Sequence, residues 1–242
     1  MMHQDKNPDD RAARLRRLKV IALADLLLRS SKSDTDLQAA RTALGETKAK
    51  YPIGSAQPNA MQGLRHRIAV HESGHALAHY IILGKSNIKR LFLEGEESAL
   101  ETTTPPETIT ADLARKFMVI FLAGRAAEER IYGRNMVGNG AGLDLSKATA
   151  LAYEAITELG FDEAFGLISF AGFSHSKRAI PPSLLSLAEQ RTVFWLKNAH
   201  LQAKALLAKH HIAHAALLDA LLVRNSLSGD EVAEIIYAHL ID

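Results

Sequence analysis

Residues 68–79, IAVHESGHALAH, place three histidines and a glutamate inside a run of apolar residues. The apolar spacing, together with Gly84 as a helix-ending residue, predicts a helix over about 64–83. His71 and His75 are four residues apart, so on a helix they lie one turn apart on nearly the same face. Polar side chains on a largely apolar helix need buried partners. The pattern therefore predicts a packed helix on which the imidazoles of His71 and His75 share one binding partner.

A divalent metal ion is the partner that these residue types favour. Two imidazoles one turn apart can both reach one Zn²⁺ at about 2.0–2.1 Å. Glu72 flanks the same face, where a glutamate of the H-E-x-x-H pattern acts as a general base and not as a ligand. His79 lies two turns beyond His71, a rise of about 12 Å, so it cannot bind the same ion. We expect His79 at the surface or in a role supporting the ligands. The alternative to a metal is a pair of core histidines that other protein groups satisfy.

The third ligand must come from elsewhere in the chain. The sequence has no cysteine, which leaves His, Asp and Glu as ligands. Ala78 and Ile81 stand where the extended pattern H-E-x-x-H-x-x-G-x-x-H requires Gly and His, so that class is excluded. The downstream candidates are Glu128 or Glu129 within a predicted helix, and Asp144 at the start of another. The residues alone do not decide between the helical glutamates and the aspartate.

The rest of the sequence predicts a mainly α fold with a short β-hairpin or small sheet beside the 64–83 helix. Strands are predicted at 88–95 and 98–104, and the first, IKRLFL, is expected to offer an edge to an extended peptide. A further strand is predicted within GLISFAGF, residues 166–173. Further helices are predicted at about 110–132, 144–159, 184–208, 212–224 and 228–240, the last with Ser228 as its N-cap.

Charge and hydropathy argue against a nucleic-acid-binding protein and against a membrane-spanning one. Lys plus Arg number 29 and Asp plus Glu 27, a net charge of +2, which does not favour a nucleic-acid-binding surface. No apolar run reaches the roughly 18–20 residues of a membrane span. The N-terminus MMHQDKNPDD carries acids that argue against a signal peptide. We therefore expect a cytoplasmic protein without a membrane span.

The N-terminal part is predicted to be separate from the rest. Residues 11–29 form a predicted helix with a basic first half, for which we favour a solvated face over contact with a membrane or an acidic partner. Residues 51–63 carry Pro and Gly and no charge, as linkers do. The predicted domains are an N-terminal helical segment with linker, 1–60, and a second domain, 61–242. The histidines of HHIAH at 210–214 are predicted to be an exposed polar turn and not a second metal site.

Three segments in order resemble a known family: HRIAVHESGHALAHY, LAGRAAEERIYG and GNGAGLDLSKATALAYEAITELGF. They are similar to the peptidase domain of the FtsH family of zinc metalloproteases, peptidase family M41. The tail LLDALLVRNSLSGDEVAEII resembles the end of that domain, so the likeness covers about 64–240. It implies a zincin-like helical peptidase domain that hydrolyses unfolded or extended polypeptides. Carried over residue by residue, it implies His71, His75 and Asp144 as Zn²⁺ ligands and Glu72 as the general base.

The resemblance also implies partners. Family members usually join this peptidase to an AAA+ ATPase and assemble as hexamers, so a homo-hexamer and an AAA+ ATPase acting in trans are candidates. The sequence contains no G-x-x-x-x-G-K-[ST] loop, so ATP dependence is not predicted from it. Leu143 stands where the family usually has Asn before the ligand aspartate. The alternative function is a catalytically silent peptidase-like module that assembles with or regulates an AAA+ protease partner.

Overall fold

The structure is a computed structural model that describes residues 60–94, 97–103 and 108–240. Residue contacts divide the chain between Ala60 and Met61, and the elements below belong to the second unit, with α3 starting one residue earlier. The helix predicted at 11–29 and most of the predicted linker lie outside the described residues. The division into two functional domains stays a prediction.

Helices dominate the described residues, as the sequence predicts. They are α3 (Ala60–Leu83), α4 (Ala111–Tyr132), α5 (Gly142–Thr157), α6 (Phe170–His175), α7 (Pro182–Lys209), α8 (His211–Arg224) and α9 (Gly229–Tyr237), with 3₁₀ turns η1 (Lys85–Asn87) and η2 (Arg134–Met136). The strands are β1 (Ile88–Glu94), β2 (Glu97–Thr102) and β3 (Ser226–Ser228). The mainly α fold with a small sheet is therefore confirmed, and the predicted long helices agree with α3, α4, α5, α7 and α8 to within a few residues at each end.

The sheet has the order β2-β1-β3, with both pairings antiparallel. Leu91 in β1 lies opposite Leu100 of β2 and Leu227 of β3. The central strand is therefore β1, and the prediction that IKRLFL offers a free edge is wrong. The partner strand β3 has only three residues, too few to produce an alternating pattern in the sequence. Among the described strands, the unpaired edges belong to β2 and β3.

The strand predicted within 166–173 is also wrong, because this segment contains the short helix α6. Gly166 has a φ of +83°, which interrupts an extended run. The buried ring of Phe170 packs edge-on against Phe165 and Phe173, with ring centroids 5.6 and 6.5 Å apart. Phe170 and Phe173 are three residues apart, so they lie on one side of a helical turn. The segment is therefore buried by helical spacing and not by side chains that alternate across a strand.

The N-cap predicted at Ser228 is confirmed. The Ser228 side chain accepts a hydrogen bond from the Glu231 amide at 3.3 Å, and the Glu231 carboxylate accepts one from the Ser228 amide at 2.9 Å. This reciprocal pair is a capping box, which satisfies two amides at the start of α9. It follows directly from the S-x-x-E spacing.

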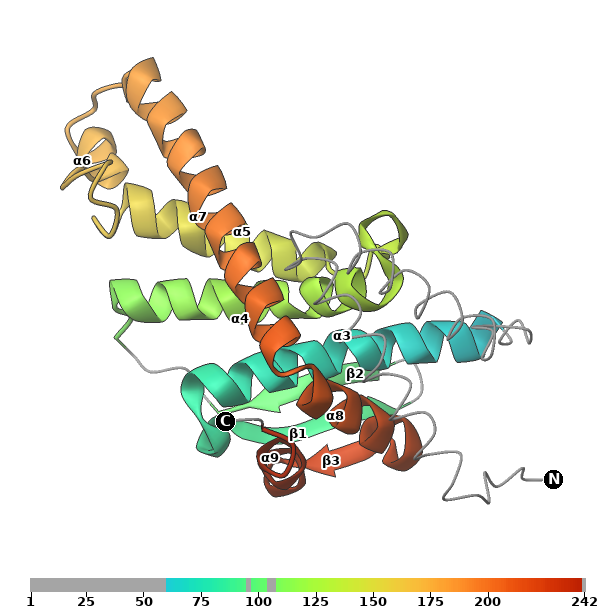
Figure 1. The fold of residues 1–242 in the computed structure, drawn as a ribbon. Helices are drawn as coiled ribbons and strands as arrows, with labels where there is room; N and C mark the ends of the chain where they lie inside the picture. Colours follow the sequence, from blue (N-terminus) through green and yellow to red (C-terminus); the bar gives the residue numbers. More distant parts are fainter. Residues whose placement is uncertain (1–59, 95–96, 104–107, 241–242) are drawn as a thin grey trace, which may run out of the picture. The chain divides into compact units, whose positions relative to one another are not determined.

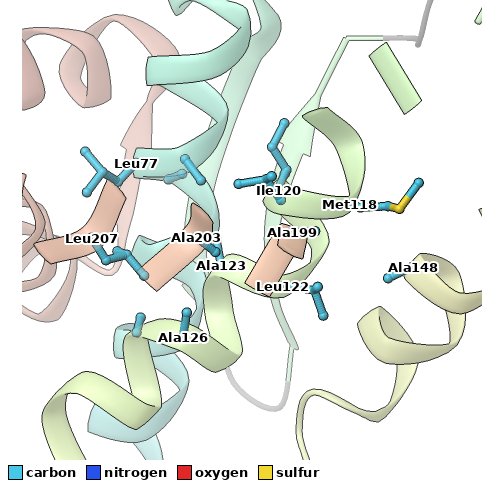
Figure 2. Packing of buried hydrophobic residues seen from close by; sticks show 14 of the residues in the cluster. Leu77, Met118, Ile120, Leu122, Ala123, Ala126, Ala148, Ala199, Ala203 and Leu207 are labelled. Carbon is cyan, nitrogen blue, oxygen red and sulfur yellow. The ribbon is translucent and has the colours of Figure 1, made fainter. Parts of the chain in front are cut away.

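Helix α3 lies between the sheet and α4, and α5 and α7 pack on α4 (Figure 1). Small side chains allow the helices to approach closely. Figure 2 shows Ala199 and Ala203 of α7 beside Ala123 of α4 within the hydrophobic core. The buried face of α7 repeats every three or four residues, as one face of a helix must, at Ala188, Thr192, Trp195, Ala199, Ala203 and Leu207.

Within the described residues, no helix taken singly has the length and apolar character of a membrane span. Helices α7 and α8 meet that criterion only when taken together, across a bend of 81°.

The contact between α3 and α4 depends on Gly74. A Cβ at this position would lie 2.6 Å from the Cβ of Ala127 and 2.9 Å from the Ala123 carbonyl oxygen, closer than such atoms can pack. Only a residue without a side chain allows the two helices to come this close. The same contact brings the histidine face of α3 against α4.

We expect Gly74→Ala to lower the free energy of unfolding by about 1–3 kcal/mol, the usual cost of an overpacked core. Urea denaturation of the purified protein measures it. Gly172→Ala in α6 is the matched control, because a Cβ there meets nothing within 4 Å. Equal stabilities for the two variants would contradict the close approach at Gly74.

Candidate metal centre

Three side chains converge on one point between α3 and α5. The Nε2 atoms of His71 and His75 lie 3.0 Å apart, and Asp144 Oδ2 lies 3.1 Å from the first and 3.3 Å from the second. Ligand atoms at 2.0–2.1 Å from a tetrahedral zinc ion are roughly 3.3–3.4 Å apart. The donor set and its spacing therefore fit one zinc-sized ion. The described residues contain no other cluster of three or more His, Asp and Glu side chains arranged in this way.

The far side of each imidazole is held by a hydrogen bond. His75 Nδ1 lies 2.8 Å from the carbonyl oxygen of Ile120, which can only accept, so Nδ1 carries the hydrogen. His71 Nδ1 lies 2.9 Å from Glu128 Oε1. Both rings are thereby oriented with Nε2 toward the shared point. Such partners are typical of histidines that bind metals, because they set the tautomer and the ring orientation.

The two glutamates considered as the third ligand do not lie at the two Nε2 atoms. Glu128 contacts the opposite nitrogen of His71 from the one that faces Asp144. Glu129 lies in a separate polar cluster, 3.1 Å from His200 and 3.4 Å from Lys204. The structure brings Asp144, and neither glutamate, to the two Nε2 atoms.

Glu128 also ties α3 and α4 to the segment that leads into α5. Its Oε2 accepts hydrogen bonds from Arg67 Nη1 and from the Gly138 amide, both at 3.1 Å. Arg67 in turn donates to the Met136 carbonyl at 2.6 Å and lies over the ring of Tyr132, 4.3 Å from its centroid. One buried carboxylate therefore links His71 to the loop that ends at the helix carrying Asp144.

Gly124 on α4 forms the surface against which both imidazoles lie. A Cβ at this position would sit 2.5 Å from His75 Nε2 and 2.6 Å from His71 Nε2. Any side chain here would displace the two nitrogens. This requirement can be inferred only in general terms from the Gly and Ala content of LAGRAAEE. The roles of Arg67, Gly138 and the Ile120 carbonyl leave no pattern in the sequence.

Contacts within the site shift the pKa values of His71, Asp144 and Glu128. Burial acts to lower the pKa of His71, but contacts with Asp144 and Glu128 outweigh it and raise this pKa to about 9. Burial acts to raise the pKa of Asp144, and hydrogen bonds with His71 and His75 hold it well below its usual range. The pKa of Glu128 is lowered to about 2, because its bonds to His71, Gly138 and Arg67 outweigh burial. Without a metal, a proton on His71 supplies the positive charge that the two carboxylates require.

Glu72 and His79, also on α3, differ in their surroundings. Glu72 is half-buried, and its charge helps to raise the pKa of His71. His79 is only 5% exposed, so of the two alternatives expected for it the surface position is wrong, and the role supporting the ligands stays a prediction. Its Nδ1 is buried and has no hydrogen-bond partner among the described residues. The eight-residue separation keeps His79 outside the group of converging ligand atoms, as the helix geometry predicts.

Comparison with known proteins identifies the family. A model of peptidase family M41 matches residues 60–235. The chain belongs to peptidase family M41. This confirms the family indicated by the three sequence segments, and the M41 match spans α3 to α9, including the whole converging group.

Individual relatives of this M41 chain carry consistent names. It is similar to ATP-dependent zinc metalloprotease FTSH 9 of Oryza sativa, 31% identical over 71% of this chain and 22% of the relative. It is similar to ATP-dependent zinc metalloprotease FTSH 11 of Arabidopsis thaliana, 30% identical over 69% of this chain and 21% of the relative. For ATP-dependent zinc metalloprotease FtsH 1 of Sorangium cellulosum the identity is 29%, over 71% of this chain and 30% of the relative. The M41 chain therefore matches less than a third of the length of each of these relatives.

The raised pKa of His71 predicts how pH changes the effect of metal on stability. Its pKa of about 9 lies above the ordinary 6.5, so the protonated ring stabilises the metal-free protein fully below pH 6.5 and loses this effect as pH rises through 9. A metal needs the neutral ring and competes with the proton. We therefore expect the difference in Tm between zinc-saturated and metal-free protein to widen from pH 6.5 to 9.

Differential scanning calorimetry of both forms measures this difference. Metal-free His71→Asn is the control, because it should lose the part of the stability change that the ring proton causes. A difference in Tm that stays constant over this pH range would contradict the assignment of the shifted pKa to His71.

Proposed function

We propose that this chain is a zinc-dependent endopeptidase that cleaves unfolded or extended polypeptides. Membership in family M41 makes it a peptidase at the level of the family. The observation that supports zinc-dependent cleavage is the convergence of His71 Nε2, His75 Nε2 and Asp144 Oδ2. A hydrogen bond at Nδ1 orients each imidazole. These three residues would hold the ion.

Zinc is the metal that the site and the relatives favour together. Two imidazoles and one carboxylate form a ligand set found in catalytic zinc sites, which leave a further position open. The similar proteins from rice, Arabidopsis and Sorangium are named zinc metalloproteases. When bound, zinc supplies a Lewis acid that polarises the scissile carbonyl and makes water nucleophilic at neutral pH.

The chain's own residues supply orientation and proton transfer. Glu128 and the Ile120 carbonyl keep His71 and His75 turned toward the ion. Glu72, the residue after the first ligand, takes the proton from the attacking water and delivers it to the departing amine. This route forms no covalent bond between enzyme and substrate, because water is the nucleophile.

The sheet offers a way to hold an extended substrate. Since β1 is paired on both sides, a peptide could add to the unpaired edge of β2, the longer of the two outer strands described. Main-chain hydrogen bonds of this kind bind many sequences, which suits an enzyme acting on unfolded chains. The free edge was expected at IKRLFL and is proposed instead at Glu97–Thr102.

Dependence on ATP, an AAA+ ATPase partner and a hexamer are further proposals. The relatives are named ATP-dependent, and the match covers between a fifth and a third of their length. A cytoplasmic location stays a prediction from the sequence.

We expect Glu72→Gln to retain zinc and to lower kcat on unfolded casein at least roughly 10²-fold, as loss of a general base does. Zinc content by mass spectrometry and cleavage by gel assay are the measurements. Glu154→Gln on the exposed face of α5 is the matched control. Full activity in Glu72→Gln would contradict the proposed base. A zinc-loaded wild-type protein that cleaves nothing would instead support the silent-module alternative.

The third ligand is tested by two carboxylate-to-amide changes of equal size. We expect Asp144→Asn to lose stoichiometric zinc on dialysis, because the amide is a poor ligand. We expect Glu128→Gln to retain it with about 10–100-fold weaker affinity, the usual cost of losing the partner behind a ligand histidine. The opposite order of zinc retention would move the third ligand to Glu128.

A further inference from the structure

His214 is a buried histidine that the proposed reaction does not use. It lies on α8, in the 210–214 segment, and is 2% exposed, so the exposed polar turn predicted from HHIAH is wrong at this residue. Its Nε2 lies 3.0 Å from Ser73 Oγ and 3.3 Å from the Val70 carbonyl oxygen. Ser73 Oγ also donates to the Val70 carbonyl, at 3.1 Å. We assign a hydrogen to Nε2 of His214, because the Val70 carbonyl can only accept and an Oγ that donates to this carbonyl can still accept from Nε2.

The two partners of His214 bracket the functional part of α3. Val70 precedes His71 and Ser73 follows Glu72, so one turn of helix carries both the proposed ligand and the proposed base. Glu128 of α4 holds the same turn through His71. His214 contacts it from a different helix, far along the chain.

We propose that His214 is a positioning residue, which by donating its Nε2 hydrogen to Ser73 and Val70 fixes the turn of α3 that presents His71 and Glu72. This inference builds on the ligand and base roles proposed above. It couples α8 to the metal centre. A rotation or shift of this turn would move the ligand and the base together, and small displacements at a reacting centre are costly.

The surroundings keep His214 in the form that this role needs. Burial, and to a smaller extent the charge of Arg130, lower its pKa to about 4 against the opposing effect of the bond to Val70. In neutral solution it is therefore an uncharged donor. An apolar side chain would leave Ser73 without the donor and α8 without a directional contact to α3.

The test compares His214→Phe, which keeps an aromatic ring but removes the donor, with His214→Gln, which keeps an N–H near the position of Nε2. We expect His214→Phe to speed zinc release to a chelator roughly 3–10-fold, at or below the lower end of the effect of groups that touch a ligand directly. His214→Gln should stay close to wild type. His211→Phe is the matched control on the same helix, because Nδ1 of His211 lies 3.1 Å from the Ala208 carbonyl oxygen, whereas His214 contacts Ser73 of α3.

Two further readouts separate positioning from simple loss of stability. The visible absorption bands of the Co(II)-substituted protein report the geometry of the metal ligands, and we expect them to change in His214→Phe and to recover in His214→Gln. On casein, kcat should fall with KM unchanged, because the substrate-binding surface is intact. A variant with a lower Tm but wild-type zinc release and Co(II) spectrum would overturn the proposal.

Ser73→Ala provides a second route if His214→Phe fails to fold. It removes the acceptor and should accelerate zinc release in the same direction, by a smaller factor since the Val70 carbonyl remains. In the double variant the effects should not add, because both changes break one contact. Additive effects, or no effect of Ser73→Ala together with none of any folded His214 variant, would contradict the coupling.

The readouts also separate this inference from the proposed function. If the wild-type protein binds zinc but cleaves no polypeptide, the peptidase proposal fails, while zinc release and the Co(II) spectrum still test His214. If the wild type cleaves casein and His214→Phe matches it in every readout, only the positioning role fails.

Discussion

The close approach of α3 and α4 is the constraint on which the rest of the site depends. Two glycines permit it: Gly74 on α3 and Gly124 on α4, where added Cβ atoms would clash with Ala127 and with the imidazoles of His71 and His75. At this distance His75 reaches the Ile120 carbonyl, and Glu128 reaches the far nitrogen of His71. The packing of α3 against α4 therefore also sets the orientation of the His71 and His75 imidazoles.

Where α3 and α4 meet, the buried carboxylates of the centre need neighbouring donors and positive charge. Glu128 is buried with its side chain 2% exposed, which would be very unfavourable without Arg67, the Gly138 amide and His71. Asp144 faces the two imidazoles in the same way. The metal-free arrangement satisfies these carboxylates with a proton on His71, where a cation would replace it. The side chains of the site are thus arranged to compensate a positive charge.

Much of the fold and part of the site could be predicted from the sequence, wherever the signal is local. Helical periodicity locates α3, α4, α5, α7 and α8, and the S-x-x-E spacing locates the cap of α9. The four-residue interval places His71 and His75 on one face. The failures come from non-local effects. The short strand β3 joins β1 only because the chain returns to it about 135 residues later, which follows from the pairing of Leu91 with Leu227 and not from any pattern in SLS. The burial of His79 depends on the elements packed around α3, which the interval of eight residues from His71 does not reveal.

The sequence by itself determined that two histidines and a glutamate would share a packed helix, because helical geometry depends only on intervals of three and four residues. It left Asp144, Glu128 and Glu129 as equal candidates on chemical grounds, and only a family resemblance separated them. The tertiary structure decided which carboxylate faces Nε2 and which lies behind Nδ1, because this depends on the distance and rotation between α3, α4 and α5. It also decided that His214 meets Val70 and Ser73, a contact between residues more than 140 positions apart. Such contacts are set by packing across the whole core, and no local pattern encodes them.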